Sequence, residues 1–257
     1  MRLRTSRPGT GRRAHQRGFS LVELSVVLLV AGVVGWAVVG GYENSATLRD
    51  RDRATQTAEN LRDALRAFAL RNGRLPCPDS SGSGWEGDGT GACAEGIEAG
   101  WLPYRALGLD VPQDTLHASY GVYRNRAATG GDADLAVATE RTGDLPGSPG
   151  YRNARDLMAG LVTAGNEPLV ATHARLTGDD AAEGAIDCTT NVRSHPAFFI
   201  VMPLNDRNAD GRRLDSPHAV DTACAYAPGT ALRLDRDDVV AAESLAALTG
   251  WLGAHAP

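Results

Sequence analysis

The chain begins with a basic segment that is followed by a long apolar run. Residues 24–42 carry no charged side chain and are rich in Val and Leu. A run of this length is about what a helix needs to cross a bilayer. Arginines precede the run and none interrupts it, so the positive-inside rule leaves the amino terminus in the cytoplasm and exports the rest. The pattern predicts a signal peptide or a signal anchor.

An amphipathic helical pattern continues beyond the apolar run. Small and apolar side chains recur at spacings of three and four residues at Ala54, Ala58, Leu61, Leu65 and Phe68. This spacing predicts a stripe packed against a body, and Gly73 is expected to end the helix. We therefore predict one long helix over residues 19–73, membrane-spanning at about 24–42 and amphipathic at about 47–72. Unbroken, it would be about 80 Å long at 1.5 Å per residue.

Residues 74–257 lack long helical periodicity and predict mainly strands and loops. Strands are expected at residues 119–124, 134–138, 196–202, 220–226 and 238–242. Short helices are expected at 153–164, where Asn153 is a suitable N-cap, and at 244–252. Runs rich in Gly and Ser at 80–91 and 142–150 predict exposed loops.

Composition and charge remove several classes of function. All 26 basic residues are arginine, so a Schiff-base lysine and a P-loop lysine are both excluded. Six arginines lie within residues 1–18, and the remaining 20 face 31 acidic residues, a net charge of −11. Such an acidic body argues against nucleic acid as the main partner. A length of 257 residues allows one or two domains.

Glu23 lies at the start of the apolar segment, where a carboxylate without a partner is costly. The surrounding sequence Arg17-Gly18-Phe19-Ser20-Leu21-Val22-Glu23-Leu24 resembles the class III leader of type IV prepilins and type II secretion pseudopilins. The resemblance implies that a prepilin peptidase cleaves between Gly18 and Phe19, removes residues 1–18 and methylates the new amine of Phe19. It also implies that Glu23 acts in assembly. There, its carboxylate would pair with the terminal amine of a neighbouring subunit.

The same resemblance implies a fold, a function and a set of partners. The fold would be α+β and pilin-like, with the long helix packed on an antiparallel β-sheet body and with residues 74–257 as a periplasmic or extracellular domain. The function would be that of a minor pilin or pseudopilin, a structural subunit and not an enzyme, of a type IV pilus or a type II secretion filament. Its partners would be the prepilin peptidase, other pilin subunits and an inner-membrane assembly platform. The chain would cross the inner membrane once and then enter the filament.

Two alternatives to a purely structural subunit remain open. A minor pilin at the filament tip could bind a surface or a secreted substrate through its loops. A membrane-anchored periplasmic enzyme would need no cleavage after Gly18. The six histidines are scattered, and no Gly-x-Ser-x-Gly sequence frames a nucleophile, so we expect no catalytic residues.

Four cysteines predict two disulfides in an exported body. The segments Leu75-Pro76-Cys77-Pro78-Asp79 and 100–109 (GWLPYRALGL) resemble a subgroup of prepilin-like proteins. A bridge from Cys77 to Cys93 would close a Gly- and Ser-rich loop and contribute about 3 kcal/mol in the chain-entropy model. Four cysteines allow three pairings, and we favour the sequential one, which also joins Cys188 to Cys224. The spacing of a zinc site is absent.

The segment from Asp206 to Gly211 matches the first half of a calcium loop, Asp-x-Asn-x-Asp-Gly. Its twelfth position is Pro217 where a calcium loop has a bidentate glutamate. The expected ligands are Asp206, Asn208 and Asp210, with Asp215 completing the shell. The alternative is a solvated turn, because Asn, Asp and Gly favour turns. Calcium is the one cofactor that the sequence suggests.

Overall fold

The computed structural model describes residues 20–91, 93–148, 150–178, 186–230 and 237–256. The chain divides into two units, residues 1–48 and 49–257, and the helix α1 (Leu21–Asn72) runs from one into the other. In the first unit the large apolar side chains from Leu21 to Trp36 are exposed. Within the described ranges, no helix combines the length and the apolar content that a bilayer crossing requires. The membrane span at about 24–42 stays a prediction.

The part of α1 that belongs to the second unit buries the predicted stripe. Ala58, Leu61, Leu65 and Phe68 are all buried in the main core. The helix ends at Asn72, as predicted, because Gly73 adopts a φ of +60° and donates its N–H to the Ala69 carbonyl at 2.9 Å. Only glycine takes this left-handed conformation without strain.

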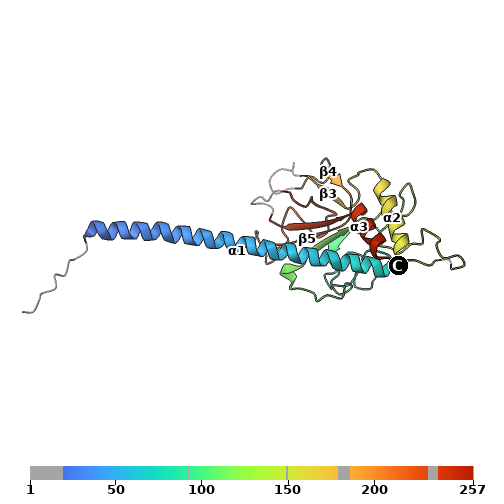
Figure 1. Cartoon of the computed structure of the whole chain (residues 1–257), viewed down its shortest axis with the longest axis horizontal. Coiled ribbons are helices and arrows are strands. Elements are labelled where there is room, and N and C mark those ends of the chain that lie inside the picture. Colours follow the sequence, from blue (N-terminus) through green and yellow to red (C-terminus); the bar gives the residue numbers. More distant parts are fainter. Residues whose placement is uncertain (1–19, 92, 149, 179–185, 231–236, 257) are drawn as a thin grey trace, which may run out of the picture. The chain divides into compact units, whose positions relative to one another are not determined.

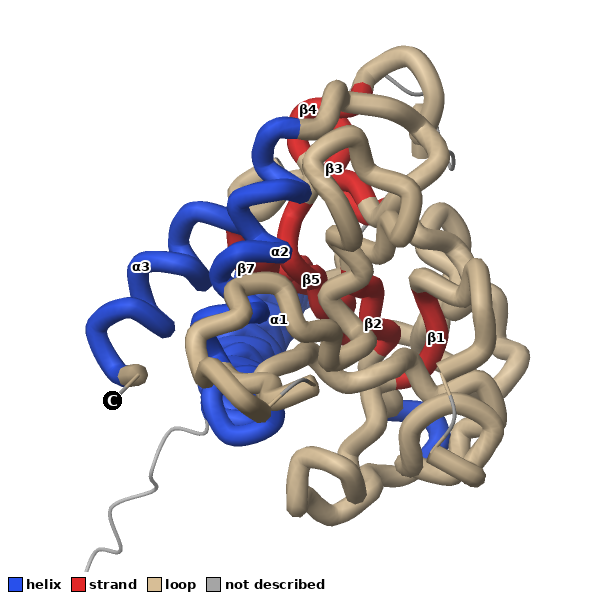
Figure 2. The backbone as a smooth tube through the Cα atoms, turned by 90° about the vertical axis from the view of Figure 1, so that its right-hand side faces the viewer, coloured by secondary structure: helices blue, strands red, loops and turns tan. Residues whose placement is uncertain are grey.

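The body, whose strands are drawn as arrows in Figure 1, is built on a four-stranded antiparallel sheet with the strand order β1-β2-β5-β7 (Figure 2). These strands are β1 (Ala99–Trp101), β2 (Ser119–Val122), β5 (Pro196–Met202) and β7 (Val239–Ser244). In the register, Tyr120 lies opposite Ile200 and Phe199 opposite Ala242. All seven residues of β5 are buried, as befits an inner strand that is covered on both faces.

The two faces of this sheet pack against different layers. Tyr120, Phe198 and Ile200 belong to the core shared with α1 and with the helices α2 (Ala154–Asn166) and α3 (Leu245–His255), which contact each other. Phe199 and Val201 point the opposite way, because side chains alternate along a strand. They meet a second sheet of order β4-β3-β6, made of β4 (Val192–Ser194), β3 (Arg175–Thr177) and β6 (Cys224–Tyr226). A 3₁₀ turn, η1 (Asp114–Leu116), precedes β2.

The α+β class and most predicted elements are confirmed. β5 has the predicted bounds, β2 and β6 are shorter, and β7 and α3 start one residue later than expected. Asn153 caps α2 by accepting the Arg155 N–H at 2.7 Å. The predicted strand at 134–138 is wrong. These residues form a buried turn, because the Asp134 carboxylate accepts the Ala136 N–H at 3.1 Å and holds the backbone out of a ladder.

Candidate functional site

Gly18 and Phe19, the predicted cleavage pair, lie outside the described residues, which begin at Ser20. Glu23 lies in the first turn of α1, where its Oε2 accepts the Ser20 N–H at 3.0 Å. The Ser20 hydroxyl in turn accepts the Val22 N–H at 3.3 Å. The pair therefore forms a reciprocal helix cap. Sequence analysis missed this cap, although its Ser-x-x-Glu spacing was available as a signal.

This geometry gives the Glu23 carboxylate a role within its own chain. A negative charge in the first turn is favourable beside the positive end of the helix dipole. The side chain is nevertheless exposed in this unit, so the carboxylate remains open to a second partner. A test of its role in assembly must therefore separate capping from charge.

The two disulfides have the sequential pairing that we favoured. Cys77 pairs with Cys93 and Cys188 with Cys224, at Cα–Cα distances of 5.5 and 6.0 Å. The first bridge closes a loop that is also held by buried carboxylates. Asp79 accepts the backbone N–H groups of Ser81 and Gly82 at 2.8 and 2.9 Å.

A second carboxylate ties this loop to the end of α1. Glu86 pairs with Arg74 at 2.5 Å and accepts the Cys77 N–H at 2.7 Å. The hydrogen bond to Glu86 is the main cause that raises the pKa of Arg74. The predicted exposed loop at 80–91 is therefore anchored, although Trp85 within it is half exposed.

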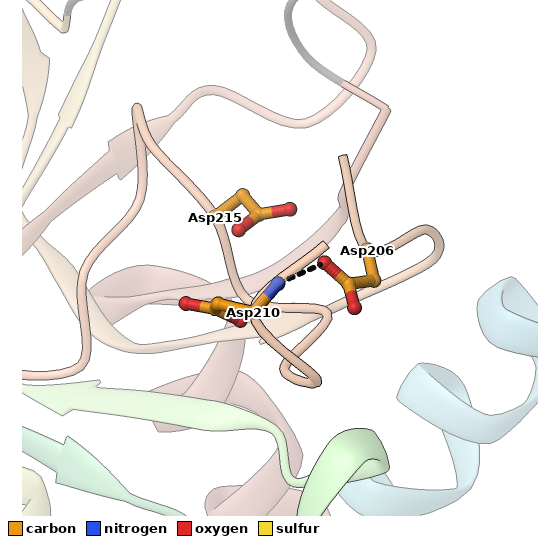
Figure 3. A group of neighbouring side chains, drawn as sticks. All are labelled: Asp206, Asp210 and Asp215. Carbon is orange, nitrogen blue, oxygen red and sulfur yellow. Dashed lines mark hydrogen bonds between the residues drawn. The ribbon is translucent and has the colours of Figure 1, made fainter. Parts of the chain in front are cut away.

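Three of the four predicted calcium ligands gather in the loop that follows β5. Asp206, Asp210 and Asp215 each place one carboxylate oxygen within 4.8 Å of the other two (Figure 3). The Asp206 carboxylate also accepts the Asp210 N–H at 3.2 Å and the Gly211 N–H at 2.9 Å. Oxygens on opposite sides of a calcium ion lie up to about 5 Å apart, since each Ca–O distance is about 2.3–2.6 Å. The spacing thus suits oxygen ligands around one hard cation.

Asp215 gives this cluster a feature that a solvated turn does not need. The residue is only 5% exposed, and its Oδ2 accepts the Arg207 N–H at 2.6 Å. Its Oδ1 is buried and has no hydrogen-bond partner. A buried carboxylate oxygen without a donor is costly, and a bound cation is one way to satisfy it.

Asn208, the fourth predicted ligand, makes local turn contacts. Its Oδ1 accepts the Asp210 N–H at 2.9 Å, and its Nδ2 donates to Asp210 Oδ2 at 3.2 Å. These bonds leave the turn interpretation open for Asn208, while they orient Asp210 within the cluster.

The loop is fastened to the start of β7 by two charged contacts. Arg207 pairs with Asp237 at 3.5 Å, and His218 Nδ1 contacts Asp238 Oδ2 at 2.8 Å. Burial raises the pKa of Asp238, against the opposing effect of its hydrogen bond with His218. The other ring nitrogen of His218 accepts the Tyr226 N–H at 3.4 Å. With both nitrogens engaged, this His–Asp pair is structural and not poised for general-base chemistry.

Comparisons with known proteins point to the amino-terminal segment. Residues 13–39 match the family described as the prokaryotic N-terminal methylation motif. The chain is 31% identical over 80 residues to the type II secretion system core protein G of Pectobacterium carotovorum subsp. carotovorum, covering 29% of this chain and 51% of that protein. It is 34% identical over 65 residues to the protein of the same name from Klebsiella michiganensis, covering 25% and 46%.

The chain spans about half the length of these curated relatives. No solved structure matches it. The matched motif contains Gly18, Phe19 and Glu23, the three positions that the sequence resemblance singled out. The chain thus carries the prokaryotic N-terminal methylation motif and is similar over part of its length to type II secretion core protein G, which supports the resemblance to type IV pilins and type II secretion pseudopilins.

Proposed function

We propose that this chain is a minor pilin or pseudopilin, a structural subunit of a type IV pilus or a type II secretion filament. The methylation motif at residues 13–39 is the observation that carries the proposal. The names of both relatives favour the secretion filament over the pilus. The subunit is made with its amino terminus in the cytoplasm, anchored in the inner membrane by residues 24–42, and later drawn into the filament by an assembly platform.

Processing sets up the chemistry of assembly. A prepilin peptidase cleaves between Gly18 and Phe19, and the new terminal amine of Phe19 is methylated. That amine is a cation within an apolar zone and needs a counter-charge. The exposed Glu23 carboxylate of a neighbouring subunit supplies it, so that two costly charges become one pair and fix the axial register.

The mass of the mature chain tests processing. Intact-protein mass spectrometry should find a chain that begins with N-methylated Phe19. Gly18→Val should block cleavage, because the backbone must approach the peptidase closely and only glycine lacks a Cβ. Gly11→Val, in the same leader but away from the cut, is the matched control and should mature normally. Normal maturation of the Gly18→Val variant would refute the assignment.

Two substitutions separate the charge of Glu23 from its role as a cap. Glu23→Gln keeps the side chain that a reciprocal cap accepts but removes the charge. Ser20→Ala removes the cap oxygen and keeps the charge. We expect both variants to be cleaved. Assembly into filaments should fail for Glu23→Gln and persist for Ser20→Ala. The reverse outcome would make the helix cap, and not charge pairing, the function of Glu23.

We also propose that the loop after β5 binds calcium through Asp206, Asp210 and Asp215. The unpartnered buried Oδ1 of Asp215 supports this proposal beside the clustering of the three carboxylates. Without a bidentate glutamate the site should be weak, with a Kd of roughly 10⁻⁴ to 10⁻³ M. The ion would hold the loop in its observed conformation and would take no part in a reaction.

Thermal unfolding measures this binding. Millimolar calcium should raise the melting temperature of the full chain by mass action. Asp210→Ala should abolish the rise, whereas Asp221→Ala, an exposed acid outside the cluster, should keep it. Identical melting curves with calcium and with a chelator would mean that the loop is a turn that does not bind calcium.

A further inference from the structure

A groove of about 620 Å³ lies inside the second unit, along the part of α1 that starts at Asp50. Its walls come from α1, from the loop between β1 and β2, from the end of β5 and from the calcium-loop segment. The apolar lining includes Ala54, Leu61, Leu109, Leu116, Met202 and Leu204. Ligand sites typically have volumes of about 300–1,000 Å³ and an apolar lining with a few placed polar groups. The groove therefore has the size and character of a binding site.

Its floor and its rim differ in exposure. Leu61, Met202 and Leu204 are buried, whereas Leu109 and Leu116 are 37% and 36% exposed. The Tyr104 hydroxyl accepts the Ala118 N–H at 3.0 Å and keeps its own O–H as a donor. The floor is mainly hydrocarbon surface, and covering such surface is favourable by about 25 cal/mol per Å².

Four charged side chains line the groove, and two of them lack a partner of opposite charge. Asp50 and Arg53 pair with each other at 3.2 Å. Arg213 donates to the Leu204 carbonyl at 3.1 Å but meets no carboxylate among the described residues. Asp110 likewise meets no cation within the described ranges. The groove thus presents an apolar floor, one unpaired cation and one unpaired anion.

We propose that this groove binds a zwitterionic phospholipid from the membrane that anchors the chain. The acyl chain lies along the apolar floor, the phosphate accepts hydrogen bonds from Arg213, and the ammonium group donates to Asp110. One molecule of this class carries all three features. This inference rests on the membrane anchoring in the proposed function.

The position of the groove along the chain supports a lipid as its occupant. Asp50 follows the last residue of the apolar run, Tyr42, by eight residues in the sequence. The proposed membrane span therefore ends only a few residues before the segment of α1 that lines the groove. A second copy of the chain fits less well, because the chain after the leader carries a net charge of −11 and repels itself.

Photo-crosslinking tests the proposal on the full chain. The protein is reconstituted in vesicles of phosphatidylethanolamine and phosphatidylglycerol that contain phosphatidylethanolamine with a diazirine on its acyl chain. After illumination, peptide mapping should find label in residues 24–42 and also in residues 104–116 and 202–213. Leu109→Asp should remove the groove label. Arg213→Gln should lower it about tenfold, the loss expected for one charge-assisted hydrogen bond.

Arg212→Gln is the matched control, since Arg212 is the exposed neighbour that does not line the groove. Its groove label should match that of the unaltered chain. A measurement without any substitution guards against misfolding. Replacing the labelled phosphatidylethanolamine by labelled phosphatidylglycerol, which lacks the ammonium group, should lower the groove label and leave the label at 24–42 unchanged.

The label pattern distinguishes the possible failures. Label confined to residues 24–42 would overturn the lipid site while leaving the membrane anchor in place. Absence of label at 24–42 would overturn the anchor and, with it, the lipid site. Crosslinks from the groove to a second copy of the chain would overturn the lipid in favour of a subunit contact. Equal groove label in the Arg212→Gln and Arg213→Gln variants would refute the proposed headgroup contact.

Discussion

Asp134→Ala should be among the most destabilising single changes in the body. Asp134 accepts Arg124 Nε and Nη2 at 2.9 Å each, and the side chains of both residues are at most 4% exposed. Arg124 also donates to the carbonyls of Ala94 and Ile97 at 2.7 and 2.8 Å. The guanidinium thus joins the turn at 134–136 to the segment before β1.

The magnitude follows from the burial of the pair. Removing one partner of a buried ion pair leaves an uncompensated charge and costs about 3–5 kcal/mol. An exposed pair nearby provides the control, because Glu95 is 81% exposed and contacts Arg126 at 3.0 Å. Glu95→Ala should therefore cost less than about 1 kcal/mol. Urea unfolding of the full chain in mild detergent, followed by tryptophan fluorescence, measures both free energies.

The pH dependence provides a second check on the same pair. Burial raises the pKa of Asp134, but the hydrogen bonds from Arg124 and Arg126 outweigh it, so the pKa lies below its usual value. The stabilisation is therefore complete above about pH 4, the ordinary aspartate range, and is lost as the pH falls through the lowered pKa. The difference between the unaltered chain and the Asp134→Ala variant should shrink in this acidic window. A loss below 1 kcal/mol at pH 7, or a difference that does not change on acidification, would refute the reasoning.

Two further predictions concern packing and covalent constraint. Gly121→Ala should lower the free energy of unfolding by about 1–3 kcal/mol in the same urea assay, because a Cβ at this position would lie 2.2 Å from the Phe199 ring. Gly165→Ala is the control and should have little effect, because a Cβ there would have no other atom within 4 Å. Replacing both Cys188 and Cys224 by Ser should lower the melting temperature. The bridge joins cysteines 36 residues apart, and closing a loop of this length contributes about 3–4 kcal/mol in the chain-entropy model. An unchanged melting temperature would contradict a structural role for this disulfide.

The parts of the fold that the sequence predicted correctly are those specified by local signals. Gly73 ends α1 because its left-handed conformation is a property of the residue itself. Asn153 begins α2 because its short polar side chain reaches the backbone of its own first turn. The long apolar run of β5 also marks an inner strand without reference to its neighbours. Such signals do not depend on contacts with residues that are distant in the sequence.

The failures depend on partners that are distant in the sequence. Residues 135–138 form a short apolar run that resembles a strand, but the contact of Asp134 with Arg124 and with its own backbone selects a turn. β1 has only three residues, too few for a period of two to be visible. The groove beside α1 draws its walls from separate segments, so no single stretch of sequence marks it.

The calcium loop combines both cases. Its spacing indicates Asp206 and Asp210 directly, but the isolation of Asp215 Oδ1 is a consequence of burial that spacing cannot show. The isolated oxygen is costly to bury, and this cost favours a cation where the motif alone fits a turn equally well. Without a cation, three carboxylates with oxygens within 4.8 Å repel one another, and the repulsion is a cost that binding removes.

The change in unfolding free energy caused by Asp210→Asn should therefore have opposite signs in calcium and in chelator. The amide keeps an oxygen that can accept the Arg212 N–H, which Asp210 Oδ1 accepts at 2.7 Å, and it relieves the repulsion. In chelator the variant should be at least as stable as the unaltered chain. With calcium at ten times Kd the unaltered chain gains about 1.4 kcal/mol by mass action and should become the more stable of the two. Urea unfolding under both conditions measures the crossing, and curves that keep the same order in calcium and chelator would mean that the carboxylates serve the turn alone.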